Sequence, residues 1–313
     1  MSQYQAFPDR NTFASLKDKV VVVAGGASGI GAALVTILHR YGAHVVFGDI
    51  NHDSGGTLIQ SLFTRGRRAN NGSALTFLPC DVCKYNDIYS LFHTARGKHN
   101  RVDHAVFVLA SVGKDQGSTR TIEVNFLAAC AFARISIPFL RRQATDKGQA
   151  DVGQQLSNNS AEPSLTFLSS VTGFRDAPGM FLYQTSKQAI LGLMRAMRTV
   201  IFSRDGIRVN AICPGMTESP ITSTGGLICA FKGRSPESSA QLPSHYQSSA
   251  AVAGHIASVM LAKGLNGKSI YVEEGKGWDF EDGLAREMPR WLGEEPTRWS
   301  DENLTFLESL GSL

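Results

Sequence analysis

The chain has 313 residues, 42% of them hydrophobic, and a chain of this length and composition can bury one large core. Its 31 basic and 27 acidic side chains leave a net charge of +4, with no Lys/Arg run long enough to indicate a nucleic-acid surface. The polar opening, residues 1–15, lacks the apolar segment of a secretory signal, and no stretch approaches 18 consecutive apolar residues. We therefore expect a cytoplasmic protein without a membrane span.

The first predicted strand leads into a glycine-rich turn. Residues 20–23 are four consecutive valines, a pattern typical of a strand buried on both faces of a parallel sheet. The turn 24–31 follows and continues into the apolar, helix-like segment 32–38. Glycines there let the backbone approach a pyrophosphate, and the helix N-terminus offers free N–H groups. Plain loops are also glycine-rich, but the strand–turn–helix order favours a dinucleotide site at Gly25, Ser28, Gly29, Ile30 and Gly31.

The second predicted strand, residues 44–48, ends at Asp49. This is about the separation from the glycine turn at which a carboxylate accepts hydrogen bonds from the adenosine ribose. The same carboxylate would repel a 2′-phosphate, and no Arg or Lys at Ile50, at Asn51 or in the glycine turn reverses this. The charges favour NAD(H) over NADP(H). The alternative is an aspartate that merely caps the following helix.

The five cysteines are odd in number and scattered. Cys80-x-x-Cys83 resembles half of a redox or zinc site, but no second pair or nearby histidine set completes it. The eight histidines show no ligand spacing. We therefore predict no metal and buried or incidental thiols, which suits a reducing cytosol.

Tyr183 and Lys187 form the pair with the clearest chemistry, and Ser170 lies upstream of them. On a helix, positions i and i+4 lie on one face, so the phenol and the ammonium project together. A nearby cation favours the phenolate, which would bring the tyrosine closer to acid–base work near neutral pH. Taken alone, the pair equally fits a solvated helix face.

Together these features resemble the classical short-chain dehydrogenase/reductase family over roughly residues 17–280. Gly25, Gly29 and Gly31 match the family spacing Gly-x-x-x-Gly-x-Gly. The resemblance implies an α/β fold: a single-domain Rossmann fold with a doubly wound parallel sheet of about seven strands and helices on both faces. Residues 1–16 would be an N-terminal extension and residues 281–313 a C-terminal tail.

The resemblance also implies a set of site residues. Asn125, Ser170, Tyr183 and Lys187 would be catalytic. Ser170 would hold the substrate oxygen and Tyr183 would exchange its proton. Lys187 would bind the nicotinamide ribose and lower the tyrosine pKa, while Asn125 would hold a proton-relay water. The cofactor contacts beyond the glycine turn would be Asp49, Ile50, Asp81, Val82, Ala110, Tyr183, Lys187, Pro214, Gly215 and Thr217.

The implied function is an NAD(H)-dependent oxidoreductase that interconverts a secondary alcohol and a ketone. One alternative is a redox-neutral epimerase or cyclase that uses the same tyrosine with nicotinamide bound. A second is a non-catalytic dinucleotide sensor, against which the intact Ser–Tyr–Lys–Asn set argues. The resemblance favours a homodimer or homotetramer.

The chain departs from the family pattern in several places. Residues 108–111, Val-Leu-Ala-Ser, stand where the family has Asn-Asn-Ala-Gly, so the hydrogen bonds of those amides must be made otherwise. Residues 143–162 are polar, which predicts an inserted surface loop. In the family, residues 219–249 would form a substrate lid. Apolar side chains within it would suit a bulky hydrophobic substrate: Leu227, Ile228 and Phe231.

The tail carries three large aromatic side chains in a polar context, Trp291, Trp299 and Phe306. This pattern predicts docking on the body or on another subunit. The extended tail also looks like that of fungal members of the family that tailor secondary metabolites.

Overall fold

The fold is known from a computed structural model that describes residues 3–4, 10–65, 72–112, 119–141, 162–220, 222 and 246–309. The insertion predicted at 143–162 lies outside these residues apart from Glu162. Of the lid predicted at 219–249, residues 221 and 223–245 also lie outside, including Leu227, Ile228 and Phe231.

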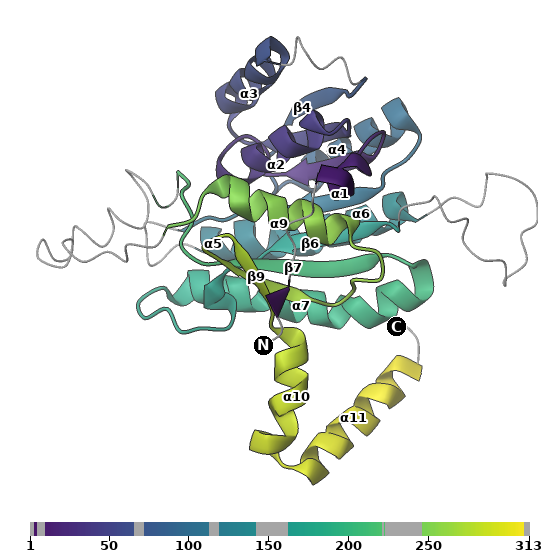
Figure 1. Cartoon of the computed structure of the whole chain (residues 1–313), viewed down its shortest axis with the longest axis vertical. Coiled ribbons are helices and arrows are strands. Elements are labelled where there is room, and N and C mark those ends of the chain that lie inside the picture. Colours follow the sequence, from purple (N-terminus) through teal and green to yellow (C-terminus); the bar gives the residue numbers. More distant parts are fainter. Residues whose placement is uncertain are drawn as a thin grey trace, which may run out of the picture.

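Figure 1 shows a central sheet with helices on both of its faces. Within the described residues the sheet has nine strands, in the order β1 (Gln3–Tyr4), β9 (Lys276–Asp279), β8 (Ser269–Glu273), β7 (Arg208–Pro214), β6 (Ser164–Leu168), β5 (His104–Phe107), β2 (Val20–Ala24), β3 (His44–Asp49) and β4 (Leu75–Pro79). Strands β2 to β8 run parallel, whereas β9 pairs antiparallel with both β8 and β1. The predicted parallel sheet of about seven strands is confirmed, with two short antiparallel strands added at one edge.

Two helical layers cover the sheet. One core contains side chains of α4 (Tyr85–His99), α6 (Ala128–Leu140) and α7 (Phe181–Asp205). The opposite core contains side chains of α2 (Gly29–Arg40), α3 (His52–Arg65) and α9 (Ser249–Leu261), and Phe13 of α1 (Arg10–Ala14) packs on it. Helices on both faces are what the doubly wound fold requires.

The valine run explains how the central strand joins the two layers. Val20 and Val22 pack into the α4–α6–α7 core, whereas Val21 and Val23 pack into the opposite core. Successive side chains of a strand point to opposite faces, so a strand buried on both sides needs an unbroken apolar run. All five residues of β2 are buried, as the sequence predicted.

One helical segment, residues 120–140, is long and apolar enough to cross a membrane by length and composition alone. It consists of α5 (Arg120–Ile122), the π-helical turn η2 (Glu123–Leu127) and α6. Ala129 and Phe132 of this segment are fully buried in the core on one face of the sheet. These two apolar side chains thus belong to the core.

The chain ends in two helices, α10 (Glu281–Leu292) and α11 (Glu294–Ser309), which project from the body (Figure 1). The exposed fractions of Trp291, Trp299 and Phe306 are 65%, 51% and 61%. The aromatic side chains of the tail therefore stay open to solvent in a single copy. Their packing on a second subunit stays a prediction.

Candidate active site

A cavity of about 560 Å³ opens at the carboxyl ends of the central strands. The order of the strands reverses between β2 and β5, and ligands of open α/β sheets bind at such a switch point. The loops that follow β2, β3, β5, β6 and β7 all contribute to the wall, as does the start of α7. Segments far apart in the sequence thus meet at one site.

The glycine turn forms the wall beside α2. Gly25 and Gly29 adopt φ values of +87° and +50°, which residues with a Cβ rarely adopt. A Cβ on Gly31 would collide with the carbonyl oxygen of Gly25, so the turn closes only with glycine at that position. The side chain of Ser28 does not cap α2, and the first-turn N–H groups of a helix have no partner within it. All five predicted residues of this turn line the cavity: Gly25, Ser28, Gly29, Ile30 and Gly31.

Asp49 lies at the end of β3, beside this turn. One carboxylate oxygen accepts from the Ala27 N–H at 3.0 Å and the other from the Asn51 N–H at 3.0 Å. A carboxylate has further lone pairs, so Asp49 can still accept from a ligand. The helix that follows is capped by Asn51, whose side chain accepts from the Ser54 N–H at 3.0 Å. Helix capping is therefore not the role of Asp49, and both Asp49 and Ile50 line the cavity.

Asp81 and Val82, expected at the adenine ring, are not among the residues that line the cavity, whereas Arg120 is. Asp81 accepts from the Cys83 N–H at 3.1 Å and from the Arg120 guanidinium at 3.3 Å. Arg120 also lies 3.7 Å from the Glu123 carboxylate. Sequence reasoning missed Arg120 because no motif marks it; only the fold brings α5 beside the loop after β4.

Ser170 and Tyr183 lie next to each other on the cavity wall. Ser170 follows β6 and begins the 3₁₀ turn η3 (Val171–Gly173), where its side chain accepts from the Thr172 N–H at 3.2 Å. Tyr183 lies in the first turn of α7. Burial raises the pKa of the Tyr183 phenol, and a hydrogen bond with Ser170 acts in the opposite direction. Both residues line the cavity.

Lys187 lies behind the wall and is fully buried. Its Nζ donates to the carbonyl oxygens of Leu109 at 2.9 Å and Leu168 at 3.0 Å, and lies 5.7 Å from the centre of the Tyr183 ring. Burial lowers the pKa of this ammonium to about 7. The expectation that Lys187 lowers the pKa of Tyr183 does not hold in this structure. Both groups are desolvated, which disfavours the charged form of each.

Asn125 is fully buried in the π-helical turn η2. It accepts from the Ser111 N–H at 2.7 Å, donates to the Ser111 carbonyl at 2.9 Å and donates to the Ser186 hydroxyl at 3.0 Å. The Ser186 hydroxyl in turn donates to the carbonyl of Tyr183 at 2.7 Å. Asn125 therefore connects the loop after β5 to the tyrosine helix. Residues 108–111 lack the two asparagines of the family pattern. The contacts of Asn125 and the hydrogen bond from Lys187 to Leu109 hold this segment in place instead.

Pro214, the last residue of β7, lines the cavity together with Gly215 and Thr217, and Ala110 lines it after β5. A Cβ on Gly215 would collide with the carboxylate of Glu273. The Thr217 hydroxyl donates to the Gly215 carbonyl at 3.0 Å. Every predicted cofactor contact except Asp81, Val82 and the buried Lys187 thus lies on one cavity wall.

Comparison with known proteins agrees with this geometry. The family model described as short chain dehydrogenase matches residues 19–226, which is more than half of the chain. The chain belongs to the short chain dehydrogenase family. This dehydrogenase is 26% identical over 304 residues to 5′-hydroxyaverantin dehydrogenase of Dothistroma septosporum, covering 90% of this chain and 92% of that one.

Two further proteins extend the comparison. The dehydrogenase is 32% identical over 215 residues to (+)-borneol dehydrogenase 1 of Salvia officinalis, covering 64% of this chain and 70% of that one. A crystal structure of levodione reductase superimposes with a TM-score of 0.67 at 19% identity, covering 83% of this chain and 97% of that chain. The structural match shows the same fold. The dehydrogenase is therefore an oxidoreductase of the short-chain alcohol dehydrogenase/ketoreductase type, and its family binds a nicotinamide cofactor.

The residues present fit a dinucleotide. Gly25 and Gly31 lie close together and have no side chains, so their backbone is accessible from the cavity. The N-terminus of α2, which no side chain caps, supplies N–H donors for a pyrophosphate. In the described part of the chain, no group of three His, Cys, Asp or Glu side chains is arranged to hold a metal ion. Cys80 is buried, and desolvation together with nearby carboxylates raises the pKa of its thiol to about 12.

Proposed function

We propose that the dehydrogenase uses NAD(H) to interconvert a secondary alcohol and a ketone on a bulky, hydrophobic small molecule, with Tyr183 as the acid–base residue. The observation that carries this proposal is the pairing of Tyr183 with Ser170 on the cavity wall, directly in front of the buried Lys187. A phenol and a hydroxyl that share a hydrogen bond can both reach one substrate oxygen. The nicotinamide, when bound, supplies or accepts the hydride.

The raised pKa of Tyr183 defines its resting state. At neutral pH the residue is a phenol, which donates a proton to a carbonyl oxygen in the direction of reduction. Ser170 holds the same oxygen and is itself fixed by the Thr172 N–H. Positioned acid–base groups of this kind contribute roughly 10²- to 10⁴-fold in rate.

Lys187 and Asn125 support the tyrosine from behind. Two of the three N–H groups of the Lys187 ammonium are given to carbonyls, which leaves one for a ribose hydroxyl. A lysine with a pKa near 7 also exchanges its proton readily at neutral pH. Asn125 fixes the carbonyl of Tyr183 through Ser186. In this proposal Asn125 also holds the water through which the proton of Tyr183 is exchanged with solvent.

Asp49 supports NAD(H) over NADP(H). Its carboxylate lies on the cavity wall and can accept from the adenosine ribose, whereas a 2′-phosphate would meet a negative charge. Arg120 adds a cation to the same cavity, but it is paired with Asp81 and Glu123. Because two carboxylates balance this guanidinium, it does not offset the repulsion from Asp49.

The cavity wall and the relatives support the substrate class. Leu109, Val124, Met180 and Met216 give the wall apolar patches around Tyr183. Relatives named for hydroxyaverantin, a 3beta-hydroxysteroid and borneol support an alcohol as the substrate. Fungal relatives, among them 5′-hydroxyaverantin dehydrogenase, support a place in secondary metabolism. We expect a homo-oligomer in the cytoplasm.

The test is turnover of a panel of cyclic secondary alcohols and ketones, followed by the absorbance of NADH and in parallel of NADPH, with the product identified. The proposal predicts a net absorbance change with NAD(H), and a lower kcat/KM with NADP(H). Product formed without net absorbance change would instead support an epimerase or cyclase. Cofactor binding without any product from the panel would support a sensor.

A further inference from the structure

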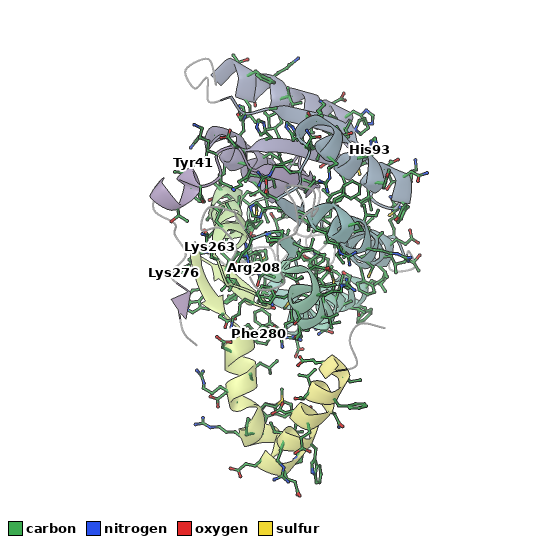
Figure 2. The ribbon with its side chains drawn as sticks, turned by 90° about the vertical axis from the view of Figure 1, so that its right-hand side faces the viewer. Tyr41, His93, Arg208, Lys263, Lys276 and Phe280 are labelled. Atoms are coloured by element: carbon green, nitrogen blue, oxygen red, sulfur yellow. The ribbon has the colours of Figure 1, made fainter. Side chains whose placement is uncertain are left out.

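The last two helices form an arm, residues 281–309, that projects from the body in both views of the molecule (Figures 1 and 2). From 298 to 308 every residue is exposed. The exposed fractions of Trp299, Leu304 and Leu307 are 51%, 53% and 61%, and that of Trp291 at the end of α10 is 65%. Large apolar side chains gathered on one exposed element mark an interaction surface.

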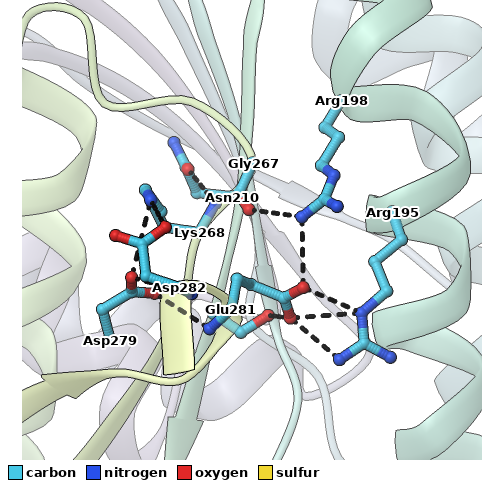
Figure 3. A network of polar contacts seen from close by, with 9 residues as sticks. Arg195, Arg198, Asn210, Gly267, Lys268, Asp279, Glu281 and Asp282 are labelled. Carbon is cyan, nitrogen blue, oxygen red and sulfur yellow. Dashed lines mark hydrogen bonds and ion pairs between the residues drawn. The ribbon is translucent and has the colours of Figure 1, made fainter. Parts of the chain in front are cut away.

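The base of the arm is fixed by a network of ion pairs and hydrogen bonds, as Figure 3 shows. The Glu281 carboxylate is buried and accepts from Arg195 at 2.9 to 3.2 Å, from Arg198 at 3.1 Å and from the Ser269 hydroxyl at 2.7 Å. Asp282, the next residue, is paired with Lys268. Removing one partner of a buried ion pair is strongly unfavourable. The first turn of α10 is therefore held on the body, and the arm projects beyond Phe280 (Figure 2).

The charge of the arm differs from that of the body. Residues 281–313 carry eight acidic and three basic side chains, whereas residues 1–280 carry 19 acidic and 28 basic side chains. Two arms therefore repel each other, and an arm and a body attract each other. The surface that suits the arm by charge is the body of another copy of this chain.

We propose that the arm docks on the body of a second copy, in a reciprocal exchange that forms a twofold dimer. Exposed tryptophans are the side chains that most often anchor protein interfaces, and Trp291 and Trp299 would be the anchors. A twofold exchange uses the same pair of surfaces twice, so neither copy is left with an uncovered arm. The proposal rests on the expectation of a homo-oligomer and is independent of the reaction chemistry.

The first experiment compares the full chain with two arm variants by sedimentation equilibrium. One variant ends at Leu292, which removes α11 and keeps the Glu281 network; the other carries Trp291→Ser and Trp299→Ser. The dimer Kd of the double variant should rise at least about 30-fold, with circular dichroism and NADH binding unchanged. Phe63→Ser, an exposed aromatic residue on α3, is the matched control and should leave the Kd unchanged.

The second experiment identifies what the arm contacts. An affinity-tagged chain ending at Leu292 is mixed with untagged full-length chain. Arm-to-body docking predicts capture of the full-length chain, because the complete arm of the full-length chain still docks on the body of the shortened chain. Arm-to-arm packing predicts no capture. Raising the salt from about 0.05 M to about 0.5 M should weaken the wild-type dimer, since screening reduces the attraction.

The results of these experiments test the docking of the arm separately from the proposed reaction. A monomeric wild-type chain, a failed capture or a dimer insensitive to salt would overturn the docking. A chain ending at Leu292 that still dimerises with the wild-type Kd would overturn it too, while leaving a homo-oligomer through another face.

Discussion

The buried Lys187 makes the stability of the dehydrogenase depend on pH in a specific way. A lysine in an unfolded chain has a pKa near 10.4, whereas burial lowers the pKa of Lys187 to about 7 in the fold. Between these two values the unfolded state binds a proton that the native state does not. The free energy of unfolding therefore rises with pH across this window, and this contribution is lost again as the pH falls towards 7.

The magnitude follows from the two pKa values. From about pH 8 to about pH 9.5, Lys187 alone should raise the free energy of unfolding by about 2 kcal/mol. Lys187→Met removes the titrating group and should remove this rise. Its absolute stability is not diagnostic, because the carbonyls of Leu109 and Leu168 lose their donor. The pH dependence isolates the lysine from that loss.

The assay is urea unfolding of the wild type and Lys187→Met at several pH values across that interval. Lys263→Met, at an exposed lysine, is the matched control and should follow the wild-type curve. Groups that titrate in both proteins cancel in the difference. If wild type and Lys187→Met show the same pH dependence, Lys187 is not a desolvated lysine and the described electrostatics of the site are wrong.

Three further substitutions test the residues expected to bind the cofactor, Gly31 and Asp49, and the buried Asn125. Asn125→Ala removes the three hydrogen bonds of a fully buried side chain and should lower the free energy of unfolding in urea titrations by about 2–4 kcal/mol. Its control, Asn86→Ala on the exposed face of α4, should change that free energy by less than about 0.5 kcal/mol. Gly31→Ala should abolish NADH binding as measured by NADH fluorescence, because the new Cβ would collide with the Gly25 carbonyl oxygen. A wild-type Kd for NADH would contradict the role of the glycine turn in binding the cofactor. Asp49→Ala should raise the affinity for NADPH relative to that for NADH at least about tenfold. An unchanged ratio of the two Kd values would show that Asp49 does not select the cofactor.

The sequence predicted the parts of this molecule that follow from local pattern. Four valines in a row require two buried faces, and the structure divides them between two cores. The spacing of Gly25, Gly29 and Gly31 predicted a turn open to a ligand, and these residues line the cavity. Such features depend on neighbours in the chain, so the sequence alone is sufficient to find them.

The features that the sequence did not predict depend on how deeply a side chain is buried and on contacts between segments far apart in the chain. The i, i+4 spacing placed Tyr183 and Lys187 on one face of a helix, but it could not show that burial would raise one pKa and lower the other. Arg120 reaches the cavity only because the loop after β4 and α5 meet in space. The role of Asn51 as the cap of α3, which frees Asp49, likewise required the fold.

The central claim is that Tyr183 exchanges a proton with the substrate while the nicotinamide exchanges a hydride. Tyr183→Phe removes the phenol hydroxyl and keeps the ring, so the most direct measurement is single-turnover oxidation of bound NADH by a ketone substrate, alongside the Kd of NADH. The account predicts a rate lower by roughly 10²- to 10⁴-fold with an unchanged Kd. A wild-type rate in the purified Tyr183→Phe variant would contradict it.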